Sequence, residues 1–189
     1  MLARLFVGGI FISAGYSKLT QPIEYFEIAL EKMPKSAITN YNLAVAFSEL
    51  GYLKDALKHY NIAHENYGRE LSIDENVHNN LGILLAEFGR FDEAIDHFKE
   101  AIDMNPFNIE AKNNLAVLYT RKKDYPMAVS HFREAIALRD DDPDLHNRLG
   151  LALMLLGNTT EARKHLQEAL RLDPGHQQAM FNLLKMGKG

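Results

Sequence analysis

The sequence predicts an all-α solenoid, because one amphipathic helix pair recurs along its 189 residues at a nearly constant spacing. The small residues Ala44, Gly82, Ala116 and Gly150 mark equivalent points, separated by 38, 34 and 34 positions. Each lies in a segment of helical periodicity, which is followed by a short turn and a second amphipathic helix. A single unit cannot offset the entropy of ordering its own backbone, so we expect successive units to stack on one another.

The repeat register divides the chain into consecutive segments. An apolar N-terminal helix and a degenerate first repeat come first, four full repeats follow, and a lone capping helix continues the register. Glycines such as Gly157 suit the turn within a pair, and Pro106 and Pro174 suit the end of a second helix. The predicted segments are residues 1–36, 37–74, 75–108, 109–142, 143–176 and 177–189.

A fixed set of residue types occupies the same positions in each unit. The third unit shows it at Leu81, Gly82, Leu85, Ala94, Phe98, Ala101 and Pro106. This pattern over residues 37–176 resembles the tetratricopeptide repeat, with His78 and His146 at the position where that family prefers tryptophan. The resemblance implies a right-handed α-solenoid of about five helix pairs, with a concave groove lined by the first helix of each pair.

Residues 1–19 are mostly apolar and support three interpretations. They can form the buried first helix of a terminal repeat. They can also be a secretory signal peptide, since Arg4 precedes a short apolar run and small residues at 13–15. The third interpretation is a membrane anchor with Arg4 and Lys18 at its two ends, although 19 residues are marginal for a span.

A second, shorter likeness lies in the same region, over residues 4–26. It rests on Arg4, Gly9, Phe11, Ala14, Gly15, Lys18 and Pro22. These residues resemble the first membrane helix of the MauE/DoxX-like membrane proteins. The other helices of that family have no counterpart in the chain, so the likeness carries no redox or transport activity. It adds weight only to contact with a membrane or a membrane protein through residues 1–19.

Composition excludes several classes of function. The formal charge of −4 provides no basic field for nucleic acid phosphates. The absence of cysteine excludes disulfides, thiolate zinc sites and cysteine nucleophiles. No metalloprotease, phosphate-loop or serine-hydrolase motif is present, so we expect neither an enzyme nor a cofactor.

Histidines recur at one position of the second helices, at His59, His97, His131 and His165. Neighbouring packed helices lie about 8–10 Å apart, whereas two zinc ligands must almost touch, so the four cannot converge on one ion. We therefore expect no metal site. The spacing instead predicts three surface pairs of residues three apart, His97 with Glu100, His131 with Glu134 and His165 with Glu168.

Asparagine gives the strongest functional signal. Asn42, Asn80, Asn114 and Asn182 are equivalent, and Arg148 takes their place in the fifth unit. Amides donate and accept hydrogen bonds, so spaced asparagines can hold the backbone of an extended peptide. The alternative is that asparagine is simply common at this position in the resembled family. The predicted groove residues are Tyr41, Asn42, Val45, Asn79, Asn80, Ile83, Asn113, Asn114, Val117, Arg121, Asn147, Arg148 and Leu151.

Two functions follow from these patterns. The first is a scaffold or adaptor that binds a peptide or helix of a protein partner in the groove. The second is a structural or assembly subunit of a membrane-associated complex, anchored by the apolar N-terminus. Some relatives grip the C-terminal carboxylate of heat-shock chaperones with a clamp of lysine, asparagine and arginine. Only Asn114 and Arg148 match it here, and Asp144 stands where a lysine is needed, so we expect no such clamp.

Overall fold

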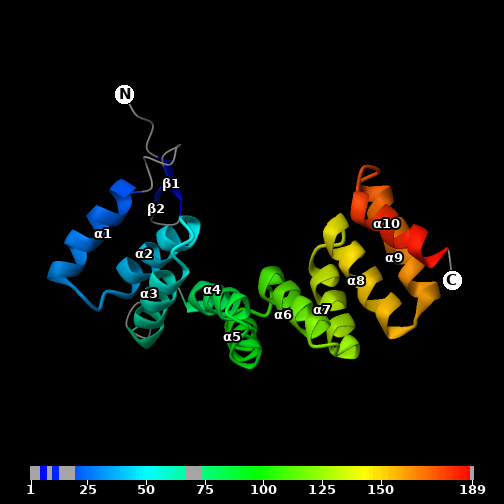
Figure 1. Ribbon diagram of the computed structural model, residues 1–189, viewed down its shortest axis with the longest axis horizontal. Helices are drawn as coiled ribbons and strands as arrows, with labels where there is room; N and C mark the ends of the chain where they lie inside the picture. The colour runs from blue at the N-terminus through cyan, green and yellow to red at the C-terminus, as the bar shows by residue number, and fades with distance from the viewer. Residues whose placement is uncertain (1–4, 8–9, 13–19, 67–73, 188–189) are drawn as a thin grey trace. The chain divides into compact units, whose positions relative to one another are not determined.

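The computed structural model of the protein describes residues 5–7, 10–12, 20–66 and 74–187 (Figure 1). These residues form short helices joined by tight turns, together with two short strands. The helices are α1 Thr20–Lys32, α2 Ala37–Glu49, α3 Leu53–Asn66, α4 Asp74–Glu87, α5 Phe91–Met104, α6 Ile109–Arg121, α7 Tyr125–Leu138, α8 Pro143–Leu156, α9 Thr159–Leu172 and α10 Gln177–Met186. The prediction of a helical repeat fold is confirmed.

The chain divides into two compact units, an N-terminal unit of residues 1–97 and a C-terminal unit of residues 98–189. The boundary falls inside α5. In the N-terminal unit α2 packs against α3, and α3 packs against α4. Its core alternates alanines with large side chains, so that the helices approach closely where the alanines lie. The core residues are Ala44, Ala56, Tyr60, Ala63, Val77, Leu81 and Leu84.

In the C-terminal unit α6 pairs with α7 and α8 pairs with α9, while α7 packs on α8 and α10 on α9. Gly150 shows why a small residue recurs on the first helices. A β-carbon at this position would lie 2.7 Å from Leu166 Cγ and 3.2 Å from the carbonyl oxygen of Ala162. The close contact between α8 and α9 therefore depends on the absence of a side chain at residue 150.

Local capping explains the helix boundaries. Asn108 and Asp142 accept hydrogen bonds from backbone N–H groups in the first turns of α6 and α8, and Asn158 does the same for α9. Gly157 ends α8 with a φ of 92°, a left-handed conformation that costs glycine little. In the equivalent turn of the fourth repeat, Lys123 adopts a φ of 64°. A side chain with a β-carbon is strained in that conformation.

Replacing Lys123 by glycine is expected to raise the free energy of unfolding by about 0.5–1 kcal/mol. Glycine removes a left-handed penalty of roughly 1–2 kcal/mol, and its greater freedom in the unfolded chain offsets part of that gain. Urea denaturation followed by circular dichroism measures the difference. The matched control is Lys122→Gly, where φ is −74° and glycine brings no such relief. A Lys123→Gly protein less stable than the parent would contradict the explanation.

The N-terminal segment departs from the predicted helix. Leu5–Val7 (β1) pairs antiparallel with Ile10–Ile12 (β2), and Leu5 lies opposite Ile12. The prediction of an apolar helix is therefore wrong for these six residues. In the sequence, the glycines at positions 8 and 9 separate two runs rich in β-branched and aromatic residues, a composition that favours a strand over a helix.

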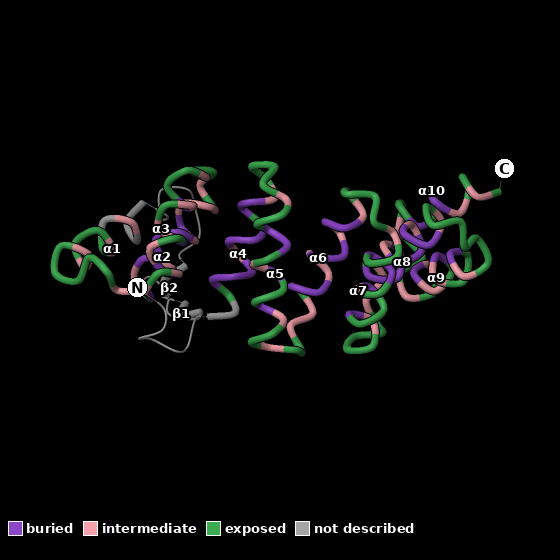
Figure 2. The backbone as a smooth tube through the Cα atoms, turned by 90° about the horizontal axis from the view of Figure 1, so that it is seen from below, coloured by how far each residue is buried: buried purple, intermediate pink, exposed green. Residues whose placement is uncertain are grey.

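The first repeat is incomplete in the structure. Figure 2 shows α1 without a fully buried residue among its described positions, whereas every later helix carries a buried stripe. Phe26 and Ala29 correspond to Phe98 and Ala101 of the third repeat, yet they are only half-buried. No helix among the described residues combines the length and apolarity needed to cross a bilayer. The signal-peptide and anchor interpretations of residues 1–19 fall largely outside the described residues and stay predictions.

Candidate functional site

The predicted groove residues lie on the first helices of the repeats, in two groups, one in each unit. In the N-terminal unit, the Asn80 side-chain amide of α4 donates a hydrogen bond to the Tyr41 hydroxyl of α2, at 3.3 Å. The Tyr41 ring meets the buried Tyr60 ring edge to face, with centroids 5.9 Å apart. Asn80 therefore links two consecutive first helices.

The same link recurs twice in the C-terminal unit. The Arg148 guanidinium of α8 donates to Asn113 Oδ1 of α6 at 2.9 Å, and the Asn182 amide of α10 donates to Asn147 Oδ1 of α8 at 2.9 Å. Both pairs join residues 35 positions apart, which is one repeat plus one residue. These polar side chains were predicted to bind a partner. In the structure, their hydrogen bonds connect one repeat to the next.

The predicted residues also differ in how far they are buried. Asn42, Asn79 and Asn147 are 4%, 5% and 3% exposed, so their side chains lie inside the helix packing and are not open to a partner. Ile83 and Arg121 are exposed. The remaining predicted residues are half-buried, with part of each side chain at the surface: Tyr41, Val45, Asn80, Asn113, Asn114, Val117, Arg148 and Leu151.

The C-terminal unit therefore holds a set of accessible candidates on α6 and α8. We call it the amide surface, and it consists of Asn113, Asn114, Val117, Arg121, Arg148 and Leu151. Arg148 is held in place by its bond to Asn113, and a guanidinium carries five N–H donors in all. Apolar Val117 lies between Asn114 and Arg121 in α6, and apolar Leu151 follows Arg148 by three positions in α8. The surface combines fixed donors, an amide and apolar contact area.

The histidines of the second helices lie in a different environment from the one predicted. His78 Nδ1 of α4 is 3.0 Å from His97 Nδ1 of α5, and His146 Nδ1 of α8 is 3.0 Å from His165 Nδ1 of α9. In the second repeat His59 Nδ1 is 2.8 Å from Asn40 Oδ1. Neither His97 with Glu100 nor His165 with Glu168 forms an ion pair within 4.0 Å among the described residues, although the Glu168 carboxylate still interacts electrostatically with the His165 ring.

The fourth repeat carries a charged version of the same contact. Lys112 of α6 is 7% exposed, and its Nζ lies 2.7 Å from Glu134 Oε2 of α7. His131 Nδ1 lies 3.4 Å from the other oxygen of that carboxylate, so this one predicted surface pair is present. Asn40, His78, Lys112 and His146 all occupy the position where the repeat pattern has tryptophan. A polar link between the two helices of a pair thus replaces the buried indole.

Burial lowers the pKa of several of these imidazoles. The pKa of His78 falls to about 4 because the ring is buried and because His64 and His97 lie beside it. Burial also lowers the pKa of His97 and His165, with His64 and His146 respectively adding to the effect. These rings are neutral at pH 7. Among the described residues, no three or more histidine, aspartate or glutamate side chains are arranged to hold a metal ion.

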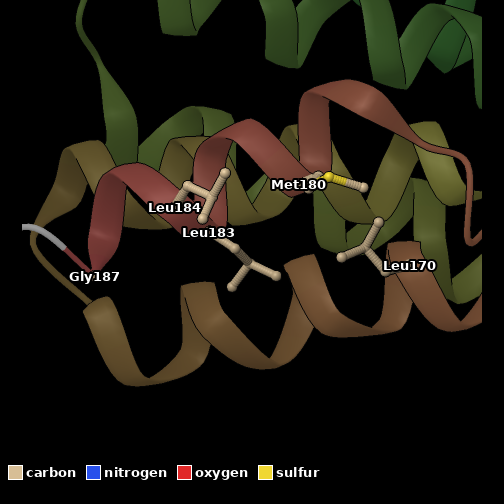
Figure 3. A pocket seen from close by; sticks show the side chains of 5 residues that line it. All are labelled: Leu170, Met180, Leu183, Leu184 and Gly187. Carbon is tan, nitrogen blue, oxygen red and sulfur yellow. The ribbon is translucent and has the colours of Figure 1, made fainter.

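An apolar depression lies between α9 and α10, with a volume of about 340 Å³ (Figure 3). Met180, Leu183 and Leu184 of α10 face Leu170 of α9 across it, and Gly187 closes one end. Its lining offers no acid, base or nucleophile. The depression therefore has no chemical group that could catalyse a reaction.

Comparison with known proteins identifies the repeat. Tetratricopeptide repeat family models match residues 35–106, 79–143 and 143–176. No curated protein sequence matches the chain. Among solved structures, MamA (residues 41 to the end) from Desulfovibrio magneticus RS-1 aligns with a TM-score of 0.76 at 13% identity, covering 85% of this chain and 88% of that one.

Two further structures carry peptide-binding descriptions. YrrB, described as a TPR protein with an unusual peptide-binding site, aligns with a TM-score of 0.75 at 18% identity and covers 87% of this chain and 83% of its own. The first TPR of Spaghetti (RPAP3), solved with the HSP90 peptide SRMEEVD, aligns with a TM-score of 0.60 at 30% identity. That match covers 62% of this chain and 93% of the RPAP3 domain.

Proposed function

The chain belongs to the tetratricopeptide repeat family, and on that premise we propose that it is a non-enzymatic scaffold that binds an extended segment of a protein partner. The observation that carries the proposal is the amide surface, where Arg148 is fixed by Asn113 across two repeats. A donor held in place before binding loses little conformational entropy when a partner arrives. Family membership supports the same reading, since a relative at 30% identity was solved with a bound peptide.

The chemistry of the amide surface favours a partner backbone over a small substrate. Asn114 and Arg148 supply amide and guanidinium groups that can hold backbone carbonyls whatever side chains accompany them. Val117 and Leu151 are half-buried and offer apolar contact for one or two partner side chains. Exposed Arg121 adds positive charge at the end of α6. We infer that the preferred segment is extended, partly apolar and carries at least one acidic residue.

The test selects linear peptides from a random displayed library against the full chain and then measures their affinities for variants. Arg121→Ala/Arg148→Ala is expected to weaken the selected peptides by about 10-fold or more, since hydrogen bonds to charged groups contribute roughly 1.5–3 kcal/mol. Arg163→Ala is the matched control, because Arg163 is an exposed arginine of the second helix α9. Equal affinity of the Arg121/Arg148 variant and the parent would remove the amide surface as the site.

A free C-terminal carboxylate is expected to add nothing to binding. Asp144 of α8 stands where a carboxylate clamp needs a lysine, and its side chain already lies 3.1 Å from His176 Nε2. The peptide SRMEEVD, made once with a free carboxylate and once amidated, should bind the chain equally weakly in isothermal titration calorimetry. Binding of the free acid at least tenfold tighter than the amide would show that the clamp is present despite Asp144.

A further inference from the structure

In two repeats, a hydrogen bond between two imidazoles joins the first helix to the second helix. His78 joins α4 to α5 through His97, and His146 joins α8 to α9 through His165, with Nδ1–Nδ1 distances of 3.0 Å in both. His78 is 3% exposed and His146 is 6% exposed. The same arrangement in two separate units shows that it follows from the repeat and is not an accident of one site.

An Nδ1–Nδ1 hydrogen bond depends on protonation. One ring must carry a proton on Nδ1 and the other must present a bare Nδ1 that accepts it. A first added proton can go to an Nε2 atom and leave this bond intact. A second one leaves both rings fully protonated, so two N–H groups and two positive charges face each other at the same short distance. The hydrogen bond is then lost, and the two positively charged rings repel each other.

Neighbouring charges offset only part of that repulsion. In the third repeat His64 of α3 adds another imidazole, its ring centroid 4.8 Å from that of His78 and 5.3 Å from that of His97. Glu93 and Asp96 of α5 are acidic, but Glu93 is bound to Arg90 of the same helix at 2.6 Å.

The fifth repeat is similar. Glu161 of α9, 4.0 Å from His165, is bound to Arg133 of α7 at 2.5 Å. Glu168 of α9 is bound to Arg171 of the same helix at 2.6 Å. His146 Nε2 lies 3.0 Å from the backbone carbonyl oxygen of Asp140, which accepts a hydrogen bond when this nitrogen carries a proton. Both carboxylates near this pair are therefore already bound to arginines, and the Asp140 carbonyl favours a proton on Nε2 of His146 but not on its Nδ1.

We propose that these two histidine pairs make the protein acid-sensitive, so that acidification weakens the link between the two helices of the third repeat and between the two helices of the fifth repeat. The direction of the effect follows from proton binding. The unfolded chain binds protons on these rings near their ordinary pKa of 6.5, whereas the folded chain holds the pKa of His78, His97 and His165 lower. The stabilisation is complete above pH 6.5 and is lost as pH falls toward the folded values.

The second repeat supplies the control, because Asn40 makes the same link to His59 with an amide that does not titrate. His78→Asn/His146→Asn should therefore keep both links when His97 and His165 take up protons, and the pH dependence should become smaller. Asn40→His should add a third titrating pair and increase the pH dependence. The measurement is thermal unfolding by circular dichroism at pH 7.5 and 5.0 in the presence of EDTA, on the full chain.

The parent Tm is expected to fall by about 5 °C or more between the two pH values, the double variant by less than half as much, and Asn40→His by more than the parent. If the double variant does not fold, each single variant should remove about half of the parent's shift. The proposal is overturned if the parent Tm does not change with pH. It is equally overturned if the histidine-to-asparagine variants lose as much Tm in acid as the parent.

Discussion

Replacing Phe132 by alanine is expected to lower the free energy of unfolding by about 3–5 kcal/mol, the largest effect of any single substitution considered for this chain. Phe132 lies on α7, which packs against both α6 and α8, and its side chain is 1% exposed. Its neighbours along the same face, Ala128 and Ala135, are fully buried and too small to fill the space that the ring leaves. Urea denaturation followed by circular dichroism gives the change.

The position of the damage is as informative as its size. Each repeat contacts mainly its neighbours, so hydrogen exchange should accelerate first in α6, α7 and α8. Met127→Ala on the same helix is the matched control, since Met127 is 39% exposed and its loss should cost less than about 1 kcal/mol. Equal destabilisation by the two variants would mean that α7 does not carry the core of its repeat.

The helix boundaries were predictable because local chemistry sets them. The fourth repeat was predicted at residues 109–142 and contains α6 Ile109–Arg121 and α7 Tyr125–Leu138. Asn108 and Asp124 cap the starts of these helices, and neither cap depends on distant residues. Small residues at a repeat spacing then predict which faces meet, as Gly150 does against Leu166.

The N-terminal strands could not be predicted in the same way. A short apolar run fits a buried helix and a strand equally well, and residues 5–12 have no repeat partner that decides between them. The degenerate first repeat predicted within residues 1–36 does contain a helix, α1 at Thr20–Lys32. That Phe26 and Ala29 are only half-buried could not be predicted. Burial depends on the segment that packs against these side chains, whereas the sequence pattern predicts only the helix on which they lie.

The polar links were missed, although the sequence contains their signal. Residues 40, 78, 112 and 146 are polar where the repeat prefers tryptophan, and a histidine follows each of them 19 positions later. The structure pairs three of these directly at that separation, Asn40 with His59, His78 with His97 and His146 with His165. The prediction considered only contacts within one helix, where residues three apart are neighbours, and so placed the histidines at the surface.

The asparagines show a similar limit. Equivalence between repeats placed them on the first helices, but it could not distinguish an amide that faces a partner from one that faces the next repeat. The structure uses Asn80, Asn113 and Asn147 in links between repeats and buries Asn42 and Asn79. Whether an amide faces a partner or the next repeat depends on the direction of its side chain within the packed helices. The sequence pattern does not predict that direction.

Removing the carboxylate of Glu134 is expected to cost about 1–3 kcal/mol. Glu134→Ala leaves the Lys112 ammonium, whose side chain is 9% exposed, without its partner at 2.7 Å. Breaking a fully buried ion pair typically costs about 3–5 kcal/mol, and the 43% exposure of Glu134 lets water recover part of that loss.

The contribution of this ion pair also depends on pH. Partial burial raises the pKa of the Glu134 carboxyl, but the hydrogen bond and charge of Lys112 outweigh this effect, and the pKa lies below its ordinary value of 4.5. The pair's contribution is therefore present above pH 4.5 and is lost as the pH falls below it.

Two further variants separate the charge from the packing. Glu100→Ala removes the exposed glutamate at the equivalent position of the preceding repeat and should change stability by less than about 0.5 kcal/mol. Lys112→Met/Glu134→Ala removes both charges and leaves an apolar chain in the space of the tryptophan of the repeat pattern, so its stability should return to within about 1 kcal/mol of the parent or exceed it. If the double variant is instead less stable than Glu134→Ala alone, the buried ammonium is not the source of the cost. In that case the aliphatic stem of Lys112 would account for the stability of the pair through its packing between α6 and α7.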